Sequence, residues 1–138
     1  MPEDSRGPGL IERFEAIRLG MADAARAAGR DPAGITLVAV SKWHEAAKLA
    51  ELARHWARHP EQGGRPVFGE SYAREAVAKM PRVEALAGFA PEWHFVGHLQ
   101  GRKAREVAGR FSLIHSLDSI SLVKGLVKEG QRLYDEGK

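Results

Sequence analysis

Apolar residues recur at spacings of three and four in several segments of this chain, which is the pattern of amphipathic helices. Over residues 10–29, this spacing places Leu10, Phe14, Ile17 and Met21 on one helical face. The same pattern predicts further helices over about residues 45–59, 71–80, 100–108 and 119–134, with a loop or a short helix at 83–87.

Short apolar runs separate these helices. Residues 35–40 are almost continuously apolar and rich in β-branched side chains, which favours a strand buried on both faces. Similar runs predict strands at about 67–70, 93–97 and 111–115. Because a helix is the usual crossover between parallel strands, four strands alternating with helices predict an α/β fold with a parallel sheet. We expect one domain over residues 1–138.

The composition is that of a globular protein of ordinary domain size. Of 138 residues, 43% are hydrophobic and 28% charged, and there is no cysteine, which excludes disulfides and thiolate metal sites. No segment approaches the ~20 apolar residues of a membrane span, and residues 1–9 contain no apolar signal core. We therefore expect a cytoplasmic protein with no membrane partner.

The chain is basic, with a net charge of +3 and a pI near 9.4. A basic balance raises nucleic-acid binding as a function class, and the tightest basic cluster is Arg102, Lys103, Arg105 and Arg110. Elsewhere Lys and Arg are interleaved with Glu, as on solvated helix faces. A non-enzymatic basic module that binds nucleic acid therefore stays as the alternative, and the charge pattern disfavours it.

Lys42 directly follows the first predicted strand. In β/α folds, ligands and catalytic groups collect at the C-terminal ends of the strands. Burial there would penalise the ammonium form of Lys42 and free its amine as a nucleophile for an aldehyde cofactor. A lysine at a strand end is also commonly a solvated cap, so position alone does not decide its role.

Polar groups also follow the second predicted strand. Gly69 would let backbone or a ligand approach closely, and Glu70 could act as a base or balance a lysine. Ser71 could contact a ligand or cap the following helix.

The third predicted strand contains a histidine and is followed by another. Because side chains alternate between the two faces of a strand, His94, Val96 and His98 point to the same side. These imidazoles could face a ligand; alternatively, His94 is packed with a satisfied hydrogen bond and His98 is solvated. His55 and His59 have the i, i+4 spacing of zinc-binding helices but no accompanying glutamate or third ligand, so we expect no metal site.

Four motifs in a fixed order carry a resemblance. They are Val38–Lys42, Phe68–Tyr72, Trp93–Gln100 and Ile114–Ser119. Together they resemble the pyridoxal phosphate homeostasis proteins, single-domain relatives of the alanine racemase barrel. The resemblance implies a (β/α)8 TIM-barrel-type fold, of which this chain supplies about the first four βα units. It implies pyridoxal 5′-phosphate (PLP) as cofactor, held as a Schiff base on Lys42, with Ser71 and His94 in the cofactor site.

The resemblance implies a role in vitamin B6 and amino-acid balance, with apo PLP enzymes as potential partners. Robust turnover, as by a PLP-dependent amino-acid racemase, is not implied, because the family lacks the second racemase domain. The chain has Ser71 where the family usually has Asn, and it is much shorter than family members, whose later loops hold the phosphate. We therefore expect it to self-associate or to bind a complementary C-terminal half.

Overall fold

The computed structural model describes residues 8–60 and 64–138. Their strands form one parallel sheet in the order β1-β2-β3-β4, so each strand pairs with its predecessor in the chain. The strands are short: β1 is Ala39–Val40, β2 is Val67–Glu70, β3 is Glu92–Phe95 and β4 is Leu113–Ile114. This sequential, all-parallel order is that of a β/α barrel, and it confirms the predicted fold class.

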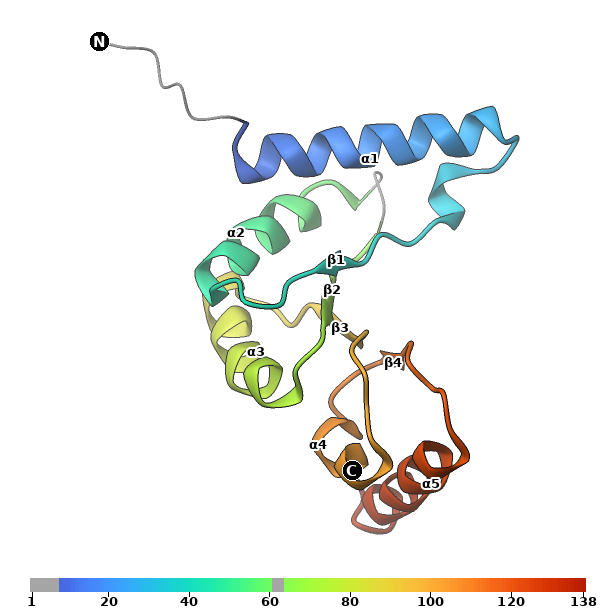
Figure 1. Ribbon diagram of the computed structural model, residues 1–138. Coiled ribbons are helices and arrows are strands. Elements are labelled where there is room, and N and C mark those ends of the chain that lie inside the picture. Colours follow the sequence, from blue (N-terminus) through green and yellow to red (C-terminus); the bar gives the residue numbers. More distant parts are fainter. Residues whose placement is uncertain (1–7, 61–63) are drawn as a thin grey trace.

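Helices connect the strands (Figure 1). The α-helices are α1 (Leu10–Ala27), α2 (Ala46–Ala57), α3 (Ala73–Ala87), α4 (Ala104–Val107) and α5 (Ile120–Asp135), and the 3-10 helices are η1 (Pro32–Gly34) and η3 (Gly101–Lys103). In Figure 1, α2 and α3 lie together on one side of the sheet, and α4 and α5 lie near β4. The opposite side of the sheet carries none of these helices.

The core lies between the sheet and the helices. Phe68 and Trp93, one from each central strand, pack against Leu49 and Trp56 of α2 and Val83 of α3. A smaller cluster under α5 contains Phe95, Leu99, Val107 and Leu122. Burial of these large apolar side chains is the main stabilising contribution to folding.

Several boundaries differ from the sequence predictions, and the third and fourth strands are also shorter than predicted. The first strand is shorter than residues 35–40, and its Val40 is 55% exposed rather than buried on both faces, because helices cover only one side of the described sheet (Figure 1). The segment predicted as one helix over 100–108 is divided between η3 and α4. The third helix begins at Ala73 rather than Ser71 and continues through Pro81 to Ala87.

Within the described ranges, no helix combines the length and the apolar character needed to cross a membrane.

Candidate functional site

The C-terminal ends of the strands bring the predicted site residues to one edge of the sheet. Val40 pairs with Gly69, Gly69 pairs with His94, and His94 pairs with Leu113. Lys42 and Ser71 each follow this row by two residues. The sequence prediction that Lys42, Ser71 and His94 belong to neighbouring strand ends therefore agrees with the observed register, although no side-chain contact joins Lys42 to the other two within the described structure.

Lys42 lies in a tight turn. The backbone N–H of His44 donates to the carbonyl oxygen of Ser41 at 3.1 Å, so Lys42 and Trp43 occupy the two central positions. The side chain of Lys42 is exposed. The expectation that Lys42 is buried is therefore wrong for the described structure, in which the residue lies in an exposed turn.

The residue after Lys42 has an unusual backbone. Trp43 has φ 66°, in the left-handed region that bulky side chains rarely adopt. Its ring lies on the ring of Tyr72, with centroids 4.6 Å apart. This stack joins the loop after β1 to the loop after β2, beside the candidate site.

Ser71 is half-buried and does not cap α3, whose N-cap residue is Tyr72. Its backbone lies close to Gly97: a Cβ added to Gly97 would stand 2.7 Å from the Cα of Ser71. Glycine at position 97 therefore allows the segments after β2 and β3 to approach each other.

A buried ionic network lies under the Lys42 turn, on the helical side of the sheet. The ammonium of Lys79 is 2.7 Å from Glu70 Oε1 and 2.9 Å from Glu75 Oε1, and it donates to the carbonyl oxygen of Ser41 at 2.9 Å. The hydroxyl of Ser41 donates to Glu70 Oε2 at 2.9 Å. Of the two roles considered for Glu70, a base or a partner for a lysine, the structure shows the contact with a lysine.

Glu75 also contacts the turn directly, because the backbone N–H of Trp43 donates to its Oε1 at 2.7 Å. Burial raises the pKa of Glu75, but the hydrogen bonds from Lys79 and Trp43 and the charges of Lys79 and His44 outweigh that effect. The pKa of Glu75 therefore lies below its ordinary value, and the ionised carboxylate is the favoured form.

His94 is buried, and both of its ring nitrogens are engaged. Its Nε2 lies 2.9 Å from Glu92 Oε1, and its Nδ1 lies 2.9 Å from Nε2 of His115. His98 is exposed, 3.6 Å from Asp118. The arrangement matches the reading in which His94 is packed and hydrogen-bonded and His98 is solvated. A ligand would meet the ring of His94 rather than a free nitrogen.

Sequence reasoning missed Lys79, Glu75 and His115. Glu75 and Lys79 stand at i, i+4, and Lys79 lies on the apolar face that also carries Ala76 and Val83. A lysine on the buried face of a helix indicates a buried acidic partner, so that pattern could have identified the network. His115 belongs to the quoted Ile114–Ser119 motif but received no role.

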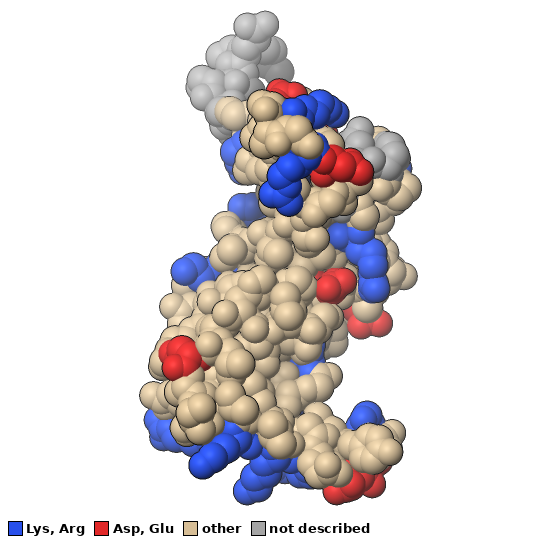
Figure 2. Space-filling model, turned by 90° about the vertical axis from the view of Figure 1, so that its right-hand side faces the viewer, with Lys and Arg blue, Asp and Glu red and all other residues tan. Residues whose placement is uncertain are grey.

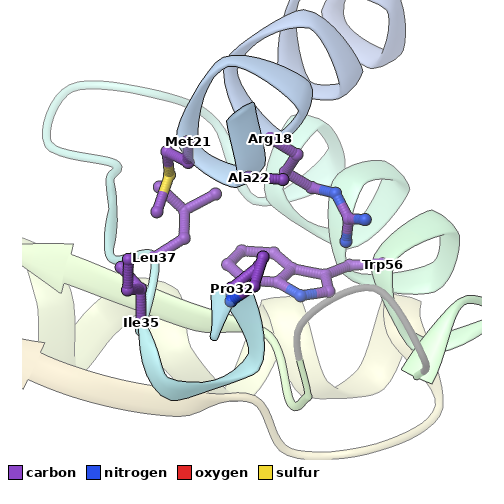
Figure 3. A pocket seen from close by; sticks show the side chains of 7 residues that line it. All are labelled: Arg18, Met21, Ala22, Pro32, Ile35, Leu37 and Trp56. Carbon is purple, nitrogen blue, oxygen red and sulfur yellow. The ribbon is translucent and has the colours of Figure 1, made fainter. Parts of the chain in front are cut away.

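Two hollows lie beside the first strand and its flanking helices. A groove of about 530 Å³ follows the open edge of β1, lined by apolar residues of α1, β1 and α2, with Ser41, His44 and Lys48 among its lining residues. A second cavity of about 50 Å³ lies between α1, η1 and Trp56 (Figure 3). It is too small for a cofactor, and its residues Ile35 and Leu37 precede β1, whereas Lys42 follows it.

The described residues contain no group of three or more His, Cys, Asp or Glu side chains arranged for a metal ion. His55 contacts Glu15 at 2.8 Å and its ring lies 5.0 Å from that of His59. The basic residues Arg102, Lys103, Arg105 and Arg110 are exposed. Figure 2 shows the side of the molecule away from α2 and α3, where the middle of the surface carries few charged side chains.

No protein-family model matches the chain. Curated proteins do: it is 34% identical over 120 residues to the pyridoxal phosphate homeostasis protein of Pseudomonas aeruginosa, covering 87% of this chain and 47% of that protein. Proteins of the same name are 36% identical over 117 residues in Escherichia coli and 35% over 123 residues in Mycobacterium leprae. The chain spans about half the length of these relatives.

A solved structure gives the same relationship. The PLP-bound structure of PipY from Synechococcus elongatus superposes with a TM-score of 0.56 at 32% identity, covering 86% of this chain and 49% of that one. The resemblance predicted from four sequence motifs is thereby confirmed. In sequence and in fold, this chain is a relative of the pyridoxal phosphate homeostasis proteins and corresponds to about half of their length.

Proposed function

We propose that this chain contributes the lysine-bearing part of a PLP-binding protein of vitamin B6 and amino-acid homeostasis, and that Lys42 is the point of attachment. One observation carries the proposal: Lys42 presents an exposed amine from a turn at the C-terminal edge of a parallel sheet. Ligands of β/α folds bind at this edge. The homologue of similar fold has PLP bound.

The residues present fit an aldehyde cofactor at that edge. In its neutral form the amine of Lys42 can attack the aldehyde carbon; a C=N bond forms and the carbonyl oxygen leaves as water. The hydroxyl of Ser71 can donate or accept a hydrogen bond at the same edge. His94, whose nitrogens are already engaged, would contribute its ring to the wall of the site.

The wider role follows from the relatives' name. We propose that the complete site holds PLP for the supply of apo PLP enzymes, and that a complementary polypeptide corresponding to the other half of the relatives completes the phosphate site. Amino-acid turnover is not part of the proposal, because the relatives' shared name refers to homeostasis of pyridoxal phosphate and not to a reaction.

The test is direct labelling. The 138-residue chain is incubated with PLP, reduced with borohydride and mapped by peptide mass spectrometry. The expected adduct lies on Lys42 and disappears in Lys42→Ala, whereas Lys103→Ala, an exposed lysine elsewhere, keeps it. Adducts confined to Lys48 or Lys103 would contradict the proposal.

A further inference from the structure

We propose that Glu75 and Lys79 of α3 are positioning residues for Lys42, which hold the backbone on both of its sides so that the turn presents the amine in one place. This inference rests on the proposed attachment of PLP at Lys42. Neither residue contacts Lys42 itself in the structure; each acts through a neighbour in the chain.

The residue before Lys42 is held through three backbone and side-chain groups. The N–H of Ser41 donates to the carbonyl oxygen of Gly69 at 2.9 Å. The carbonyl oxygen of Ser41 accepts a hydrogen bond from the ammonium of Lys79 at 2.9 Å. Its hydroxyl donates to Glu70, the carboxylate that also pairs with Lys79. Ser41 is therefore bound to β2 and to α3 at once.

The residue after Lys42 is held by the same helix. Glu75 accepts the backbone N–H of Trp43 at 2.7 Å and pairs with Lys79 at 2.9 Å. The indole of Trp43 rests on Tyr72, which immediately precedes α3. The left-handed backbone of Trp43 costs roughly 1–2 kcal/mol, and such a conformation persists only when surrounding contacts enforce it.

The make-up of the network favours a positioning role over a purely stabilising one. Lys79 and Glu70 have side chains only 8% and 1% exposed. Burying such ions costs several kcal/mol each, and apolar residues of similar volume commonly serve stability as well or better. The ammonium of Lys79 lies within ion-pair distance of one carboxylate on β2 and one on α3, and it donates a hydrogen bond to the Lys42 turn. An apolar side chain at position 79 could not make that directed contact with the turn.

The experiment compares Glu75→Ala with Glu75→Gln. An amide oxygen can still accept the N–H of Trp43, whereas alanine cannot. We measure the rate of PLP attachment to Lys42 and the hydrogen exchange of the Trp43 amide. Alanine should slow attachment about tenfold, the scale of one lost hydrogen bond to a charged group, and speed exchange. Glutamine should retain most of both properties.

Glu84→Ala, which removes an exposed carboxylate from the same helix, is the matched control and should behave as the wild type. If Lys42 is labelled and Glu75→Ala reacts at the wild-type rate, the inference is wrong and the proposed function stands. Equal losses in alanine and glutamine would also overturn it, since they would assign Glu75 a role through charge alone. A wild type with no adduct on Lys42 overturns both.

Discussion

Trp43 is the residue at which local backbone preference and the surrounding structure disagree. A positive φ at the third position of a turn normally selects glycine or asparagine, yet here it is occupied by an indole with φ 66°. The stack on Tyr72 and the hydrogen bond to Glu75 hold it there.

Replacing Trp43 by glycine and by alanine separates these contributions. Both variants lose the stack on Tyr72 and keep the N–H that Glu75 accepts. Only alanine retains a Cβ in the left-handed region, so Trp43→Ala should be less stable than Trp43→Gly by roughly 1 kcal/mol. Urea denaturation of the two variants measures the difference. Equal stabilities would mean that the turn changes conformation once the indole is removed.

Gly97 sets how closely two loops of the site approach. An added Cβ would lie 2.7 Å from the Cα and 2.8 Å from the carbonyl carbon of Ser71, and backbone atoms cannot rotate away. Gly97→Ala should therefore destabilise the fold by about 1–3 kcal/mol.

Gly20→Ala is the matched control for Gly97→Ala, because Gly20 lies within α1 with open space around it. Alanine there should stabilise the helix by up to about 1 kcal/mol. Thermal or urea unfolding of the two variants should therefore give shifts of opposite sign. If Gly97→Ala left the free energy of unfolding unchanged, the backbone at Ser71 would be able to move away at little cost.

At the residue scale, sequence reasoning could locate the candidate site but not the neighbouring residues that hold it in place. The position of Lys42 after a strand, and of Ser71 and His94 at neighbouring strands, follows from the βα alternation and from the four motifs. The pairing of His94 with His115 depends on which residues of β3 and β4 come into register. The exposure of Lys42 depends on a turn that contacts Glu75 and Lys79 of α3, which lie 32 and 38 residues away along the chain from the turn residues they bind.

At the scale of elements, hydrophobic periodicity predicted the ends of α1, α2 and α5 well and the ends of α3 and α4 poorly. The helices α1, α2 and α5 lie within two or three residues of their predicted ends, because each has a continuous apolar face. The third helix was predicted to end at about residue 80, yet α3 continues through Pro81, because Ala76 and Lys79 before it and Val83 after it are buried on one face. Tertiary packing thus overrides the local cost of proline.

The contact of α3 with the Lys42 turn should give stability a specific pH dependence. Because the pKa of Glu75 is lower in the folded than in the unfolded protein, its contribution to stability is present above the unfolded-state pKa of about 4.3. It is lost as the pH falls through the lower folded-state pKa, since the unfolded chain then binds the proton first.

Glu75→Gln isolates this effect, because every other carboxylate titrates in both proteins. The free energy of unfolding of the wild type, minus that of the variant, should be constant near neutral pH and should decrease below about pH 4.3. Urea titrations at a series of pH values give this difference directly. A difference that stays flat into acid would mean that Glu75 is not held in its ionised form.

On the scale of the whole molecule, one side of the sheet is covered by helices and the other is open (Figures 1 and 2). Val40 is 55% exposed and Leu113 is 51% exposed, although both lie in strands. In the described sheet, β1 and β4 each have one neighbour, so each leaves an edge of backbone donors and acceptors without a strand partner. The apolar groove of about 530 Å³ runs along the edge of β1.

An open edge beside an apolar groove favours pairing with another chain. We therefore expect the purified 138-residue chain to self-associate, with a mean mass by light scattering that rises with protein concentration. Val40→Lys places a charge on the open face of β1 and should lower that mass, because a buried, unpaired ammonium in the contact would be costly. Val127→Lys makes the same change at a 65% exposed position on α5 and should leave association unchanged. A wild type that stays monomeric at all concentrations would contradict the expectation. If the two lysine substitutions had equal effects, the contact between chains would not lie at β1.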